Sequence, residues 1–368
     1  MTVGPTPSPT VRHLLRDDLR GMYPGYFALV MATGILSNAF FYLGHDALSD
    51  ALYGVALVAF PALVAAAVLR LLAFPGAVWA DLVDPRRVFG FFTLVAACDV
   101  LGLQLHLRDH DHAALVLWLV ALSAWLALGY WSFAVLTFDD SQTGADVVHG
   151  GWLIAIVATE SLVLLGAPLA GRFGSLEDTI FVAVYALWGI GIVLYGIFVT
   201  LFAYRIFFLS VDAEEMNPLF WVVMGAAAIA TNAGSTLILT EPDLDFLLAM
   251  RPFVNGTTLI LWAWATWLIP LLVIFGVWRH VIRRYPLAYA PTYWSLVFPL
   301  GMYAVATYRL SLASDFRPIE LFSEVMVWFA LAAWLATMAG LLRSSAARLR
   351  GATPGAAQAT SSASSRAS

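Results

Sequence analysis

Runs of about twenty apolar residues recur along this 368-residue chain, and they restrict its possible folds more than any other feature. A helix needs about 20 apolar residues to cross the roughly 30 Å hydrocarbon core of a bilayer. Only 12% of the residues are charged and 61% are hydrophobic, whereas soluble domains contain roughly 25% charged residues. The sequence therefore predicts one all-α integral membrane domain rather than several soluble domains.

Short polar segments separate the apolar runs and define ten predicted transmembrane helices. The membrane domain is expected to cover residues 22–343, after an N-terminal segment (1–21) and before an Ala/Ser/Gly-rich tail (344–368) that we expect to be disordered. The predicted spans are residues 22–44, 51–74, 88–107, 113–137, 149–170, 178–208, 218–240, 253–279, 293–312 and 318–343.

All 19 basic residues are arginines, and their distribution predicts the orientation of the chain. With ten spans, 14 arginines lie on the side of both termini and the other 5 lie on the opposite side. Because positively charged loops stay in the cytoplasm, we expect both termini to be cytoplasmic and the protein to lie in the plasma membrane. The net charge of −5 and the lack of a basic cluster argue against a nucleic-acid partner.

A short motif repeats at the start of the odd-numbered spans. Glycine precedes an aromatic residue at Gly25-Tyr26, Gly90-Phe91 and Gly151-Trp152, and weaker copies begin Phe220-Trp221 and Tyr293-Trp294. The spacing equals one helical hairpin plus its loops, so five hairpins in the same orientation are predicted, as in transporters with parallel repeats. Because the odd spans contain most of the small, polar and helix-loosening residues, we expect them inside, around a central axis, and the even spans facing lipid or neighbours. Chance similarity among aromatic-rich helices is the alternative.

Three segments carry a resemblance to a known family: residues 24–37 (PGYFALVMATGILS), 218–225 (PLFWVVMG) and 293–301 (YWSLVFPLG). They resemble the first, seventh and ninth helices of the tellurite-resistance/dicarboxylate transporters, which include malic acid permeases, sulfite efflux pumps and guard-cell slow anion channels. The resemblance implies ten helices as five hairpins in a quasi-five-fold arrangement around a central pore. It also implies a homotrimer with one pore per subunit and an aromatic gate on the ninth helix.

Phe298 is the predicted gate. When the repeats are aligned, it shares a level with Met31, Ala96, Val157 and Gly225, and it is the only aromatic residue among them. The family's gating phenylalanine matches this position. Its ring would block the pore until it rotates away. The alternative is a core aromatic beside a proline kink.

Two carboxylates, Asp99 and Glu160, share the level three positions later. Ionisable groups inside a membrane are costly and mark functional sites by default. We expect one of them to hold a proton at neutral pH and to link proton movement to anion movement. The alternative is that each bonds a backbone group at a kink. Further pore-lining candidates, which could instead hold helices together, are Thr33, Gly34, Asn232 and Gly301.

Arg309, near the end of the ninth span, is a candidate for attracting anions to an outer vestibule, or it caps a helix end. The His- and Asp-rich residues 106–112 lack a recognised zinc-ligand spacing, so we expect a solvated turn and no metal. Phosphate-binding loops, HExxH pairs and Gly-x-Ser-x-Gly elbows are absent from the sequence. We therefore expect a protein that is not an enzyme and needs no cofactor.

These features predict the transmembrane transport of small anions. The first hypothesis is a proton-linked carrier or facilitator of C4-dicarboxylates such as malate. The second is a gated channel or exporter of chloride, nitrate, sulfite or tellurite. A third, of another class, is a non-conducting accessory or sensory membrane protein.

Overall fold

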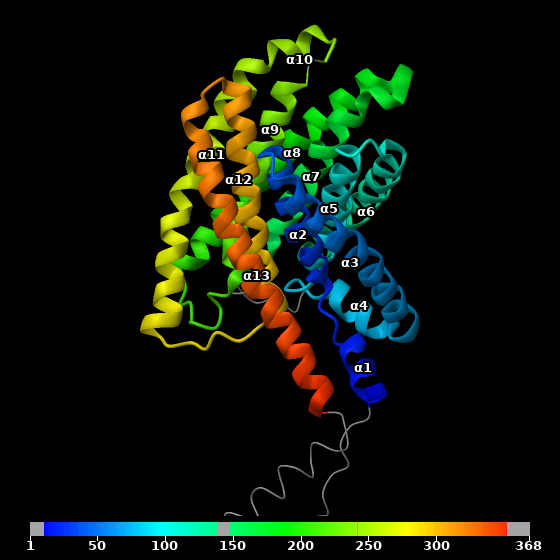
Figure 1. Ribbon diagram of the computed structural model, residues 1–368, viewed down its shortest axis with the longest axis vertical. Helices are drawn as coiled ribbons and strands as arrows, with labels where there is room; N and C mark the ends of the chain where they lie inside the picture. Colours follow the sequence, from blue (N-terminus) through cyan, green and yellow to red (C-terminus); the bar gives the residue numbers. More distant parts are fainter. Residues whose placement is uncertain (1–10, 139–147, 241, 352–368) are drawn as a thin grey trace, which may run out of the picture.

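The computed structural model describes residues 11–138, 148–240 and 242–351, and all regular elements within these ranges are helical (Figure 1). Nine helical stretches in the described residues are long and apolar enough to cross a membrane. The prediction of an all-α membrane protein is confirmed. The N-terminal helix α1 and the last turns of α13 lie at the same end of the molecule (Figure 1).

Each of the ten predicted spans overlaps one long helix. The long helices are α2 (Ala28–Tyr42), α3 (Asp46–Ala73), α5 (Phe92–His106), α6 (Asp111–Phe138), α7 (Ile154–Leu169), α8 (Glu177–Phe208), α9 (Val222–Leu239), α11 (Arg251–Val277), α12 (Trp294–Ser314) and α13 (Glu320–Gly351). Three shorter helices are α1 (Val11–Arg20), α4 (Pro75–Val83) and α10 (Asp245–Ala249).

One of the nine stretches, Gly150–Phe208, is 59 residues long and is interrupted near its middle. Gly174 has φ 55°, a conformation that glycine adopts readily because it lacks a Cβ. Helix α7 ends before this residue, α8 begins after it, and the two helices pack against each other. A single straight helix of that length would be about 88 Å long, roughly three times the thickness of the hydrocarbon core. The break therefore lets both helices fit within a membrane.

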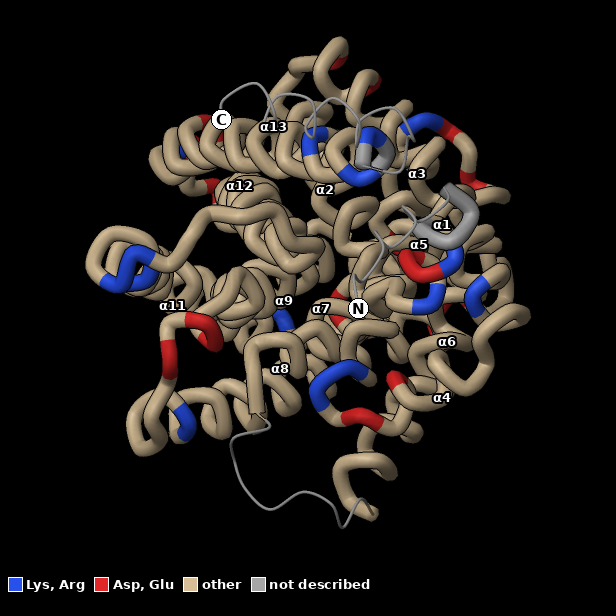
Figure 2. Tube along the Cα trace, turned by 90° about the horizontal axis from the view of Figure 1, so that it is seen from below, with Lys and Arg blue, Asp and Glu red and all other residues tan. Residues whose placement is uncertain are grey.

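Burial divides the long helices into two sets. In the spans of α2, α5, α9 and α12, 72 to 89% of the residues are buried, against 11 to 22% for α3, α6, α11 and α13. Helix α7 is buried along nearly its whole length, whereas α8 exposes large apolar side chains. We call α2, α5, α7, α9 and α12 the inner helices and the others the outer helices (Figure 2). The prediction that odd spans lie inside and even spans face outward is confirmed.

The inner helices contact one another in chain order: α2 contacts α5, α5 contacts α7, α7 contacts α9, α9 contacts α12, and α12 contacts α2. A 3-10 turn leads into each of them and contains all or part of the repeated motif. Neighbouring turns also contact each other in the same order. The turns are Pro24–Phe27, Val88–Phe91, Gly150–Leu153, Pro218–Trp221 and Pro291–Tyr293. The sequence repeat thus corresponds to a repeated structural element.

His149 caps the 3-10 turn before α7. Its Nδ1 accepts a hydrogen bond from the Gly151 N–H at 3.0 Å, and its Nε2 lies 2.9 Å from the carbonyl oxygen of Arg86. The first bond needs the Nδ1 lone pair, so the arrangement fits a neutral ring with its proton on Nε2. Desolvation of the ring is the main cause that lowers the pKa of His149 to about 4.

The last helix is longer than the predicted span 318–343. Helix α13 continues past Arg343 to Gly351, because its Ala, Leu and Arg residues favour a helix. An ion pair of 2.8 Å between Arg348 and Asp18 joins this extension to α1. The rest of the expected tail lies outside the described residues, as do Asp139-Asp140 and Glu241 of the predicted loops.

Candidate functional site

Phe298 lies in α12 with only 3% of its surface exposed, so it does not face lipid. A Cβ added at Gly301 would lie 2.9 Å from Ile35 Cγ2, so this side of α12 faces α2. A Cβ added at Gly225 would lie 2.7 Å from Pro299 Cγ, so the side carrying Pro299 faces α9. Successive residues are about 100° apart around a helix, so Phe298 lies between the side of α12 that faces α2 and the side that faces α9.

Arg309 lies on nearly the same face of α12 as Phe298, because eleven residues make about three helical turns. Its Nη2 donates a hydrogen bond of 3.3 Å to Thr236 Oγ1 of α9, and its guanidinium lies 5.6 Å from the centre of the Tyr42 ring of α2. These contacts place the half-buried cation between α9 and α2. Phe298, about 16 Å further along the same helix face, is directed into the same space.

Asp99 is 2% exposed and lies at the contact between α5 and α7. Its Oδ2 accepts a hydrogen bond of 2.7 Å from the Ser161 hydroxyl. The other carboxylate oxygen is buried and has no hydrogen-bond partner among the described residues. This carboxyl group is therefore only half satisfied by its protein neighbours.

Glu160 is directed at an outer helix. A Cβ added at Gly191 of α8 would lie 2.1 Å from Glu160 Oε1, and neither carboxylate oxygen has a hydrogen-bond partner in the described part of the chain. Asp99 and Glu160 thus share a level of the repeat but face different neighbouring helices, α7 and α8.

Thr33 and Gly34 lie at helix contacts. The Thr33 hydroxyl donates to its own helix and accepts a hydrogen bond of 2.9 Å from Trp334 Nε1 of α13, so Thr33 faces an outer helix rather than the interior of the inner set. A Cβ added at Gly34 would lie 2.6 Å from Val100 Cγ1 and 3.2 Å from Gln104 Oε1. Gly34 therefore allows α2 and α5 to approach closely.

Gly301 and Asn232 also lie between inner helices. Gly301 permits the close approach of α12 to α2, as the contact with Ile35 shows. Asn232 Nδ2 lies 3.6 Å from Met302 Sδ, a weak hydrogen bond that joins α9 to α12. These four small and polar residues thus lie at helix contacts, as such residues do in other membrane proteins.

Two buried amides, Asn38 and Gln104, were missed by the sequence prediction. Both are 0% exposed, and none of their side-chain nitrogen and oxygen atoms has a hydrogen-bond partner among the described residues. On α2, position 34 faces α5, and Ile35 lies next to Gly301 of α12. At about 100° per residue, Asn38 lies between the side of α2 that faces α5 and the side that faces α12. Phe298 lies in the same way between the α2 and α9 sides of its own helix. The sequence signal that could have identified them is an amide side chain in the middle of an apolar run.

Residues 106–112 form a polar connection between α5 and α6. His106 Nδ1 lies 2.6 Å from Asp111 Oδ1, and Asp111 also pairs with Arg172. The structure, over the ranges it describes, contains no group of three or more His, Cys, Asp or Glu side chains that could hold a metal ion. Asp111 therefore binds the His106 ring and the Arg172 guanidinium.

Comparison with known proteins assigns a family to this arrangement. Residues 21–342 match the SLAC1 (voltage-dependent anion channel) family. The chain belongs to the voltage-dependent anion channel family. This confirms the resemblance found in the first, seventh and ninth spans. Members of the family carry anions across membranes, so the chain is a multi-pass membrane protein with an anion substrate.

The chain is also similar to proteins of Mycobacterium tuberculosis and Methanocaldococcus jannaschii. An uncharacterized membrane protein of Mycobacterium tuberculosis is 39% identical over 145 residues, which are 39% of this chain and 73% of that protein. Two uncharacterized transporters of Methanocaldococcus jannaschii are 23% and 22% identical over 88% of this chain, and over 93% and 95% of their own lengths. The names of the latter pair agree with a transport function.

Proposed function

We propose that the inner helices enclose an anion pathway that Phe298 closes and in which Arg309 and Asn38 attract the anion. The observation that carries the proposal is the common direction of Phe298 and Arg309, on one buried face of α12 between α9 and α2. A guanidinium and an amide N–H are hydrogen-bond donors suited to a desolvated anion. A ring further along the same face is suited to close the passage.

The proposed architecture has ten crossings, with α7 and α8 counted separately, arranged as five hairpins in quasi-five-fold order around the pathway. The closed order of contacts from α2 through α5, α7, α9 and α12 back to α2 supports it. We further propose a homotrimer in the plasma membrane with both termini in the cytoplasm. The excess of 14 arginines over 5 supports that orientation.

For the substrate we propose a small C4-dicarboxylate such as malate, moved together with protons. Of the two carboxyl groups, only Asp99 remains in the proposal as the proton site, because Glu160 faces α8. The buried oxygen of Asp99 without a hydrogen-bond partner supports this role, because it is an acceptor that a proton can occupy. A gated channel or exporter for chloride, nitrate, sulfite or tellurite is the second candidate, favoured because Glu160 is directed at α8.

Anion flux into proteoliposomes, with and without a pH gradient, tests the proposal. Phe298→Ala should raise the flux by removing the ring. Phe40→Ala is the matched control, because Phe40 is a buried phenylalanine of α2 that packs on Trp328 of outer helix α13. A non-conducting protein would show no flux in either variant, and equal flux in all three proteins would refute a gate at Phe298.

The same assay separates the carrier from the channel. Flux of malate that is driven by a pH gradient and loses this drive in Asp99→Asn supports the proton-linked carrier. Flux that is independent of pH, and that persists in Asp99→Asn, supports the channel. Competition among malate, chloride, nitrate and sulfite then ranks the substrates.

A further inference from the structure

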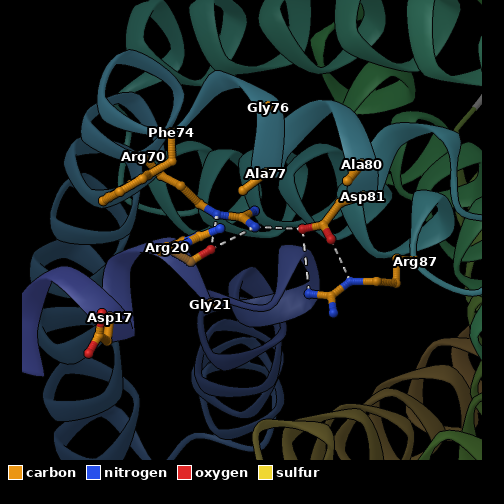
Figure 3. Close-up of a pocket in the computed structure, with 10 residues that line it drawn as sticks. All are labelled: Asp17, Arg20, Gly21, Arg70, Phe74, Gly76, Ala77, Ala80, Asp81 and Arg87. Carbon is orange, nitrogen blue, oxygen red and sulfur yellow. Dashed lines mark hydrogen bonds and ion pairs between the residues drawn. The ribbon is translucent and has the colours of Figure 1, made fainter.

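A cavity of about 730 Å³ lies between α1 and α4, at the end of the molecule where α1 and the end of α13 meet (Figure 3). Three arginines and two aspartates line it, together with small residues of α4 and the ring of Phe74. The charged residues are Arg20, Arg70, Arg87, Asp17 and Asp81. The anion pathway proposed above does not use any of these groups.

Two of the arginines hold a buried aspartate between them. Asp81 is 6% exposed, and its Oδ2 lies 2.7 Å from Arg70 Nη2 while its Oδ1 lies 2.6 Å from Arg87 Nε (Figure 3). Arg70 also donates to the carbonyl oxygen of Arg20 from Nε at 3.2 Å and from Nη2 at 3.1 Å. One carboxylate between two guanidiniums leaves a net charge of +1. The hydrogen bonds and ion pairs of this cluster join α3, α4 and the end of α1.

The surroundings increase this positive charge. The three arginines and two aspartates of the lining have a net charge of +1, and Arg16 adds a nearby cation, with its guanidinium 5.7 Å from the ring centre of Phe74. Arg20 is exposed, and its side chain makes no hydrogen bond or ion pair with the described residues. The Arg87 side chain is 38% exposed. Guanidinium groups of this kind bind phosphate oxygens in a forked geometry.

Exposed tryptophans indicate the depth of the cavity in the membrane. Trp79 of α4 and Trp131 of α6 are 56% and 37% exposed, and their ring centres are 5.4 Å apart. Trp131 Nε1 also donates to the carbonyl oxygen of Leu82 at 3.0 Å, which ties the pair to α4. Tryptophan concentrates at the headgroup level of membranes. Helix α4 and the cavity beside it therefore lie at the membrane–water interface.

An apolar surface adjoins the cavity at the end of α3. Phe74 lines the cavity, and Leu71, which lies three residues earlier and therefore beside it, is 53% exposed. We propose that the cavity binds the phosphate group of an anionic phospholipid, whose acyl chains lie against this end of α3. A free phosphate would use the arginines but not these apolar side chains, so the adjoining apolar surface favours a lipid.

The test measures lipid binding to the purified full-length protein in detergent, by native mass spectrometry and by the melting temperature. The probes are phosphatidylglycerol, phosphatidylcholine with the same acyl chains, and inorganic phosphate. We expect phosphatidylglycerol to bind in preference to phosphatidylcholine and to raise the melting temperature, because a ligand of the folded state stabilises it. Arg20→Gln should weaken phosphatidylglycerol binding about five-fold, the effect of one interfacial arginine.

Arg350→Gln is the matched control, because Arg350 is an exposed arginine of α13 outside the lining of the cavity. It should bind phosphatidylglycerol as the unsubstituted protein does. Equal affinity in Arg20→Gln and the unsubstituted protein would overturn the proposal. Inorganic phosphate at millimolar concentration that reproduces the full stabilisation would also overturn it, in favour of a free anion. Arg20 is exposed, so its variant is expected to fold, and the readout does not depend on anion flux.

Discussion

Replacing Gly225 by alanine should reveal how tightly α9 and α12 are packed beside the proposed gate. The new Cβ would lie 2.7 Å from Cγ, 2.9 Å from Cβ and 3.3 Å from Cα of Pro299. Carbon atoms prefer separations of about 3.5–4.0 Å, so the helices would have to separate by about 0.8 Å. A proline ring cannot turn aside as a flexible side chain can, and overpacking of this kind costs about 1–3 kcal/mol.

Gly189→Ala is the matched control for this substitution. Gly189 is a mid-helix glycine of α8, and a Cβ added there meets nothing within 4 Å. Both variants gain the same helix preference of alanine over glycine, roughly 1 kcal/mol. Their difference in stability therefore reports the overpacking alone, and Gly225→Ala should be the less stable of the two by about 1–3 kcal/mol.

Thermal unfolding of the two variants in the same detergent measures this difference. About 1 kcal/mol corresponds to a few degrees in the melting temperature of a domain of this order of size. Because Phe298 precedes the displaced Pro299, Gly225→Ala should also change anion flux, whereas Gly189→Ala should not. Equal melting temperatures would refute the close contact of α9 with α12, and with it the direction assigned to Phe298.

Three further predictions concern charge, buried amides and pH. Arg309→Gln should lower the apparent anion affinity at least three-fold, and more at low salt. A cation about 5 Å from an anion contributes roughly 0.8 kcal/mol at an effective dielectric constant of 80 and roughly 3 kcal/mol at 20. Unchanged affinity, or an equal loss in the surface control Arg317→Gln, would contradict this prediction. Asn38→Leu should leave the melting temperature unchanged or higher, because an unpaired buried amide is removed, while anion flux falls; unaltered flux would exclude Asn38 from the pathway. His149 has a folded-state pKa of about 4, below its unfolded value near 6.5, so its contribution to stability is lost as the pH falls from about 6.5 toward 4. The melting temperature should therefore fall over this range, and less steeply in His149→Asn, which can still cap the turn but does not titrate; parallel curves would refute the assignment.

Several features of the molecule could be read from the sequence because they depend on one helix at a time. The length and polarity of each apolar run predict a membrane helix, and the density of small and polar residues predicted correctly which spans are buried. The Gly-aromatic motif predicted a structural repeat, which the structure realises as 3-10 turns before the inner helices. The burial of Phe298 is likewise consistent with its position in the repeat.

Other features depend on how each helix is rotated against its neighbours, and only the tertiary structure decided them. The sequence placed Asp99 and Glu160 at one level, but it does not contain the direction of either side chain, and Glu160 meets Gly191 of an outer helix. Thr33 is likewise turned toward Trp334. Periodicity determines the angle between residues around one helix axis. The rotation and crossing of the helices follow from close packing of many side chains at once, and these set what each residue faces.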